Sequence, residues 1–287
     1  MSIHRIAALG ASIMVLTAGA LTGSSTAGAA GQVAPSERAA GMVAVSIDRA
    51  GVITMPTVLA PGVTTFKITT TRRQAGLQLV AFAPGYTVEQ ATLDVENGLN
   101  KNRIKALKRF EANTTLLGGV SASRDKAGKL AVDLEPGTYY AVDSNKTGSP
   151  WLQLSVGGVD TGASMKVDAT LTAVDSTKWA KRPAAIPRNG WLRFRNRADQ
   201  NHFVIMVKLL PGKTLDDFAD FLEKESGPPP VDFRTGLDSG VLSPGHDMAM
   251  KYRLPKGNYV LTCFWPDASM KGMPHAFMGM YRVVKVR

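Results

Sequence analysis

The chain contains a single cysteine, Cys263, among its 287 residues. One thiol excludes an intramolecular disulfide, so the fold depends on ordinary hydrophobic cores. An unpaired cysteine persists in an oxidising compartment when it is buried, bound to a metal or joined to a partner. The surroundings of Cys263 therefore bear most directly on function.

Common catalytic motifs are absent as well. The sequence has no Gly-x-Ser-x-Gly turn, no His-Glu-x-x-His zinc motif and no P-loop. A catalytic cysteine usually lies exposed at a helix N-terminus, whereas Cys263 follows the strand-like run Tyr-Val-Leu-Thr. These observations predict that the protein is not an enzyme.

The charge of the chain lacks the pattern of a nucleic-acid-binding protein. The formal net charge is +11, but the basic residues are spread along the chain and form no stripe with interleaved aromatic residues. We therefore expect no nucleic-acid partner. The positive charge favours solubility and affinity for an anionic cell-wall polymer.

The N-terminus has the pattern of a signal peptide. A short positive region over residues 1–5 precedes an apolar stretch over 6–21, and Ala27-Gly28-Ala29 offers a cleavage site. The apolar stretch is too short and too rich in Gly and Ser to span a membrane, and no later run is long enough. We predict a signal peptide over residues 1–29, a secreted, extracellular protein, and no transmembrane segment in the mature chain.

The pattern of the remaining chain indicates an internal duplication. Turn signals recur in the same order in both halves: Pro84-Gly85-Tyr86-Thr87 matches Pro211-Gly212-Lys213-Thr214, and Leu-Glu-Pro-Gly-Thr-Tyr matches Leu-Pro-Lys-Gly-Asn-Tyr. A polar, Gly-rich stretch over residues 157–164 separates the halves. We predict two domains, over residues 40–157 and 165–287.

Each half is predicted to be mostly β. Runs rich in β-branched and aromatic residues alternate with turn signals, for example at 63–71 and 203–210. Thr87 and Thr214 have the pattern of helix N-caps and predict one helical insertion in each half. The expected fold class is all-β, with two tandem β-sandwiches that each carry a short helical insertion.

Potential metal ligands gather in the second half. Cys263 is followed by His275 and Met280, and His202 stands upstream in another strand-like run. Two imidazoles, one thiolate and a distant thioether form the ligand set of a blue-copper electron-transfer site. In the first half, the position that corresponds to Cys263 is Asp143, and no histidine corresponds to His202 or His275.

The motifs Asn-His-Phe-Val-Ile-Met, Leu-Pro-Lys-Gly-Asn-Tyr-Val-Leu-Thr-Cys and Pro-His-Ala-Phe-Met-Gly-Met resemble those of the cupredoxin family. The resemblance covers about residues 169–287 and implies a Greek-key β-sandwich that carries type 1 copper and passes single electrons. It implies that His202, Cys263, His275 and Met280 are the copper ligands, with Met278 ranked second as axial ligand. The first half resembles a degenerate, metal-free copy.

Two departures from the family pattern are visible. The segment between Cys263 and His275 is longer than the loop typical of the family, and Phe203 follows the first histidine where Asn is frequent. The remaining histidine of the predicted mature chain, His246 in Ser-Pro-Gly-His-Asp, is predicted to be a turn residue. The three histidines that follow the signal peptide are too few for the additional copper clusters of multicopper oxidases or copper nitrite reductases.

Two other functions fit parts of the sequence. Several methionines surround His275, and soft thioethers with a thiolate and an imidazole also suit Cu(I) storage or delivery, with a copper donor or acceptor in place of a redox partner. For Met248 and Met250 we expect a place in the core. A protein of a different class, a metal-free extracellular binding or structural module that keeps the cupredoxin-like fold, is the second hypothesis.

Overall fold

A computed structural model describes residues 42–287 of the chain. The predicted signal peptide, residues 1–29, and the first two residues of the first predicted domain lie outside the described residues. Among the described residues, no helix has the length and apolar character needed to cross a membrane.

The elements of the first half are mainly strands. They are β1 (Met42–Ile47), β2 (Ile53–Thr54), β3 (Val58–Leu59), β4 (Gly62–Thr70), β5 (Ala75–Phe82), α2 (Val88–Val95), the π-helix η1 (Glu96–Asn100), α3 (Ile104–Asn113), β6 (Thr114–Ala122), β7 (Gly128–Leu134), β8 (Gly137–Asp143) and β9 (Leu152–Val156).

The second half repeats this pattern with a single α-helix. Its elements are β10 (Ala169–Asp175), β11 (Lys178–Trp179), β12 (Ala185–Ile186), β13 (Asn189–Asn196), β14 (Ile205–Leu209), α4 (Leu215–Lys224), β15 (Val231–Asp238), β16 (Asp247–Arg253), β17 (Gly257–Thr262), β18 (Pro266–Asp267), β19 (Met273–Pro274), the 3-10 helix η2 (His275–Met278) and β20 (Tyr281–Val286). The all-β prediction is confirmed.

Both predicted helix starts are capped as expected. The Thr87 side chain accepts a hydrogen bond from the Gln90 backbone, and Thr214 does the same with Asp217. The first half departs from the prediction because its helical insertion is longer than one short helix. A further helix, α3, is stable there because its apolar face, which includes Phe110, is buried against the sheet.

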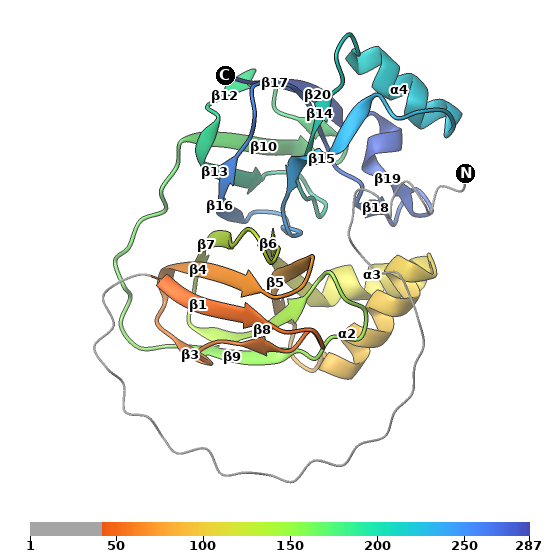
Figure 1. Cartoon of the computed structure of the whole chain (residues 1–287). Helices are drawn as coiled ribbons and strands as arrows, with labels where there is room; N and C mark the ends of the chain where they lie inside the picture. Colours follow the sequence, from red (N-terminus) through yellow and green to blue (C-terminus); the bar gives the residue numbers. More distant parts are fainter. Residues whose placement is uncertain (1–41) are drawn as a thin grey trace.

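The two halves have matching sheet orders. The five-stranded sheet of the first half runs β3-β9-β8-β5-β6, and that of the second half runs β12-β20-β17-β14-β15, which places counterpart strands in the same order. In Figure 1 each of these sheets faces strands of a second layer across a buried core. The matching orders support the duplication inferred from the turn signals.

The second layer is one sheet shared by both halves. Its order is β11-β10-β13-β16-β7-β4-β1-β2, so β16 of the second half pairs antiparallel with its counterpart β7 of the first. Leu130 pairs with Met250 at this junction, and these positions also match in the duplicated sequence. The halves therefore meet about an approximate two-fold axis. The division into two domains stays a prediction, because a continuous sheet crosses the boundary.

Candidate metal centre

The four predicted ligands lie at one end of the second five-stranded sheet. His202 stands just before β14 and Cys263 directly after β17, while His275 begins η2 and Met280 directly precedes β20. Because β14, β17 and β20 are neighbours in the sheet, residues at this end are brought close together. Strand order thus joins segments that are far apart in the sequence.

Three of these side chains converge in the structure. The Nδ1 atoms of His202 and His275 are 3.0 Å apart, and Cys263 Sγ lies 3.7 Å from His275 Nδ1. One ligand atom from each residue lies within 4.8 Å of the others. All three residues are fully buried. A thiol and two imidazoles in this arrangement form a donor set that suits copper.

Backbone hydrogen bonds hold the thiol in place. The backbone N–H groups of Phe203 and Trp265 donate to Cys263 Sγ, with donor–acceptor distances of 3.5 and 3.4 Å. Phe203 occupies the position after the first histidine, where Asn is frequent in the cupredoxin family. Since the donor is the main chain, Phe203 supplies this bond whatever its side chain.

Both histidines are also held from outside the cluster. The main chain of His202 forms paired hydrogen bonds with Leu242, at 2.8 and 3.1 Å, while its ring Nε2 atom has no partner among the described residues. The Nε2 atom of His275 lies 2.7 Å from Gln200 Oε1, and Gln200 in turn donates to Asp267. A partner at Nε2 leaves Nδ1 of the neutral ring with its lone pair toward the cluster, and such partners fix the orientation of metal-binding histidines.

The long segment between Cys263 and His275 is closed by its own small hairpin. Strands β18 and β19 pair Pro266 with Pro274 and Asp267 with Met273. The Asp267 carboxylate accepts hydrogen bonds from the backbone N–H of Ser269 and Met270 within the turn. The extra residues therefore form an ordered projection, and His275 returns to the cluster, where its N–H donates to the Trp265 carbonyl at 3.0 Å.

Burial keeps the imidazoles and the thiol neutral. Loss of hydration lowers the pKa of His202 to about 3 and that of His275 to about 4, while burial raises the pKa of the Cys263 thiol to about 12. The histidines therefore offer neutral lone pairs at neutral pH. The thiol must lose its proton when a metal binds.

The two candidate axial methionines differ in burial. Met280 is completely buried, and its main chain is fixed by its own N–H to the His275 carbonyl and by the Trp179 indole N–H to its carbonyl. Met278 is partly exposed on η2. This difference favours Met280, and its assignment as the fourth ligand stays a prediction.

The other singled-out residues lie outside the cluster. His246 directly follows a turn and does not belong to the His–Cys group. Met248 and Met250 are buried in β16 at the junction of the two halves, as expected for core residues. Met270 and Met273, by contrast, are half-exposed on the closing hairpin.

Solved structures of copper proteins are similar to this chain at low identity. An auracyanin from Roseiflexus castenholzii is 20% identical with a TM-score of 0.27, over 42% of this chain and 95% of its own. Auracyanin A, a blue copper protein from Chloroflexus aurantiacus, is 16% identical with a TM-score of 0.27, over 41% of this chain and 96% of its own. A multi-copper oxidase from Pediococcus acidilactici is 10% identical with a TM-score of 0.24, over 86% of this chain and 58% of its own.

No known protein family and no curated protein matches the sequence. Structural similarity at these TM-scores does not assign a function to the chain. Enzymes, including a Cu-containing nitrite reductase from Thermus scotoductus, are among the matched structures. The expectation that the chain is not an enzyme therefore remains a prediction.

The first half has an ion pair at the place that matches the cluster. The Asp143 carboxylate accepts hydrogen bonds from the backbone N–H of Gly76 and Asn145, at 2.9 and 3.0 Å. Gly76 and Asn145 stand at the positions in the first half that correspond to Phe203 and Trp265, whose backbone N–H groups donate to Cys263. The second carboxylate oxygen pairs with the guanidinium of Arg72. A buried anion with a fixed cation thus occupies the position of the thiol.

Several contacts at the cluster have no motif in the sequence. Gln200 reaches His275 from two residues before His202, and no common pattern marks a glutamine in that place. Trp265 donates its indole N–H to Glu111 of α3, at 2.7 Å, and so ties the Cys263 loop to the first half. The only sequence signal for Trp265 is its place two residues after Cys263.

Proposed function

We propose that the protein is a secreted, cupredoxin-like electron carrier that holds one copper ion through His202, Cys263 and His275, with Met280 as axial ligand. The observation that carries the proposal is the convergence of three buried donor atoms within 4.8 Å. Bound copper supplies one-electron chemistry by alternating between Cu(I) and Cu(II). The chain supplies neutral imidazoles, a thiol held by two backbone donors and exclusion of water.

Burial of the ligands favours electron transfer over copper delivery. Handing copper to a partner requires that incoming ligands reach the metal, whereas His202, Cys263 and His275 are fully buried. An electron can cross a protein shell without ligand exchange. We therefore place one-electron exchange first, with a redox partner whose identity stays open.

Copper handling is the second candidate, and exposed thioethers support it. Met270 is 50% exposed and Met273 is 45% exposed on the hairpin that leads from Cys263 to His275. Thioethers of this kind bind Cu(I), so they offer a first contact for incoming copper. In this alternative the buried cluster is a store that fills through the hairpin.

A titration with Cu(II) distinguishes these candidates. We expect the mature protein to retain one copper per chain after dialysis and to show an intense visible thiolate-to-Cu(II) charge-transfer band that bleaches on reduction and returns on oxidation. A colourless protein that retains Cu(I) would favour storage. Absence of both the band and retained copper would leave the metal-free binding module, in which Cys263→Ala and His202→Ala change stability alone.

Copper binding is also expected to release a proton. With the pKa of Cys263 raised to about 12 and those of His202 and His275 lowered to about 3 and 4, the thiol is protonated and both imidazoles are neutral at pH 7. Each Cu(II) bound at pH 7 should therefore release about one proton, from Cys263. Titration calorimetry in buffers of different ionisation enthalpy measures this number. A value near zero would show that the thiol is not a ligand.

A further inference from the structure

A cavity of about 380 Å³ lies at the end of the first five-stranded sheet that corresponds to the metal centre. The segment that follows β8 is short: residues 144–151 lead directly to β9, whereas in the second half the longer segment 263–280 separates β17 from β20. The volume falls within the range of small-molecule sites, about 300–1,000 Å³.

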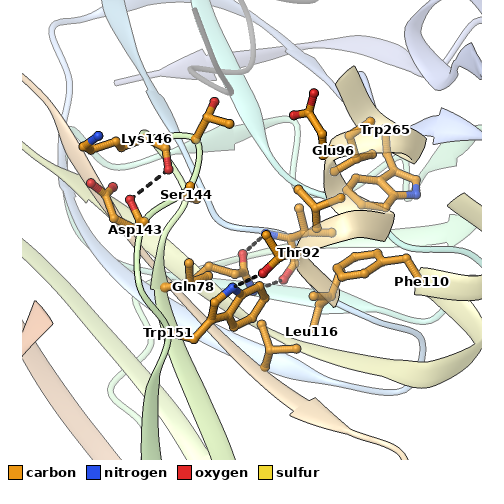
Figure 2. A pocket seen from close by; sticks show the side chains of 18 residues that line it. Gln78, Thr92, Glu96, Phe110, Leu116, Asp143, Ser144, Lys146, Trp151 and Trp265 are labelled. Atoms are coloured by element: carbon orange, nitrogen blue, oxygen red, sulfur yellow. Dashed lines mark hydrogen bonds between the residues drawn. The ribbon is translucent and has the colours of Figure 1, made fainter. Parts of the chain in front are cut away.

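The inside of the cavity is apolar and aromatic. Figure 2 shows the rings of Phe110, Trp151 and Trp265 around it, with the Leu116 side chain between them. Four valines also line it, namely Val80, Val95, Val142 and Val241. Flat, apolar walls of this kind favour a ring-bearing ligand, because aromatic side chains stack against rings.

The charges near the cavity are paired or directed elsewhere. Asp143 is paired with Arg72, and Glu96 is paired with Lys101 at 3.3 Å. In Figure 2 the Glu96 carboxylate and the Lys146 amine point away from the aromatic rings. An ion entering the cavity would lose its hydration without gaining a counter-charge, so the walls favour a neutral molecule.

Several polar side chains of the lining are already engaged or out of reach. Gln78 bonds to Leu79 and Val241, and the Thr92 hydroxyl bonds to Val88 and Trp151. The Thr147 Oγ1 atom has almost no accessible surface, so a ligand atom in the cavity does not reach it. The lining therefore favours apolar, aromatic surface over hydrogen-bonding groups.

We propose that this cavity binds a small, neutral, aromatic molecule. The ring of the ligand lies against Trp151 and Trp265. The site needs no metal. It lies next to the metal centre, because Trp265 contributes its indole to the cavity and its backbone N–H to Cys263 Sγ.

Calorimetric titration of the copper-free mature protein with 2-naphthol tests the proposal, with naphthalene-2-sulfonate as the charged comparison. We expect one 2-naphthol per chain and at least about tenfold weaker binding of the sulfonate, because its charge must be desolvated. Failure of 2-naphthol to bind, or equal binding of the sulfonate, would overturn the proposal.

Two variants locate the binding. Val95→Trp places an indole in the cavity from its partly buried wall and should weaken 2-naphthol binding by about tenfold or more, whereas Leu93→Trp, on an exposed position of the same helix, should leave it unchanged. Circular dichroism confirms that each variant folds. Equal affinity in Val95→Trp and Leu93→Trp would place the ligand elsewhere and refute the site.

A second readout, which rests on the proposed function, uses the copper-loaded protein. Occupancy against the Trp265 indole should shift the visible thiolate band when 2-naphthol is added. Cys263→Ser removes that band and should leave the calorimetric binding of 2-naphthol intact. Failure of the metal site and failure of the cavity are therefore seen in different measurements.

Discussion

Replacement of Cys263 by serine is expected to abolish the visible band and to lower copper affinity by more than about 100-fold. The thiolate supplies the electron density for the charge-transfer transition, and a serine hydroxyl does not ionise near neutral pH. Loss of a residue that only orients a metal ligand already costs about 10- to 100-fold in affinity, so loss of a ligand should cost more. Visible absorption and metal content after dialysis measure both effects.

The controls for this replacement come from the same chain. His246→Ala removes a histidine outside the cluster, and Met278→Ala removes a partly exposed thioether next to it. Both variants should retain the band and the bound copper. His275→Ala should lose them as Cys263→Ser does. A band that survives in Cys263→Ser would rule out this thiol as the source of the colour and with it the proposed ligand set.

Parts of the fold and of the cluster follow from local sequence patterns. The turn signals that recur in both halves revealed the duplication, because each marks the same junction between strands. The capping threonines marked the helix starts, since capping depends on neighbouring residues alone. The order of His202, Cys263 and His275 indicated the cluster, because the ends of neighbouring strands lie close together at one end of a sheet.

The remaining features depend on contacts between distant segments. Pairing of β16 with β7 joins the halves into one sheet, and no periodicity within either strand encodes that partner. Gln200 meets His275, and Trp265 meets Glu111, only after the whole sheet has formed. The sequence shows only that the segment after Cys263 is long, because its order comes from the hydrogen bonds of the Asp267 carboxylate.

The ion pair of Arg72 and Asp143 explains how the first half keeps its fold without the ligands of the second. A buried carboxylate stands where the second half has the thiol, accepts hydrogen bonds from two backbone donors at matching positions and has a guanidinium as its fixed cation. The Asp143 side chain is fully buried and that of Arg72 is 17% exposed. The carboxylate therefore depends on Arg72 for most of its charge compensation.

Arg72→Leu is therefore expected to lower the free energy of unfolding by about 3 kcal/mol, because it leaves the buried Asp143 carboxylate without a counter-charge. Urea unfolding of the copper-free protein measures the loss without a contribution from bound metal. Arg73→Leu, at the exposed neighbouring position, should change stability by less than about 0.5 kcal/mol. The double variant Arg72→Leu/Asp143→Asn should recover part of the loss, because the charge that lacked a partner is gone. If Arg72→Leu and Arg73→Leu changed the free energy of unfolding equally, the Arg72–Asp143 ion pair would not be what stabilises this end of the first half in the absence of a metal.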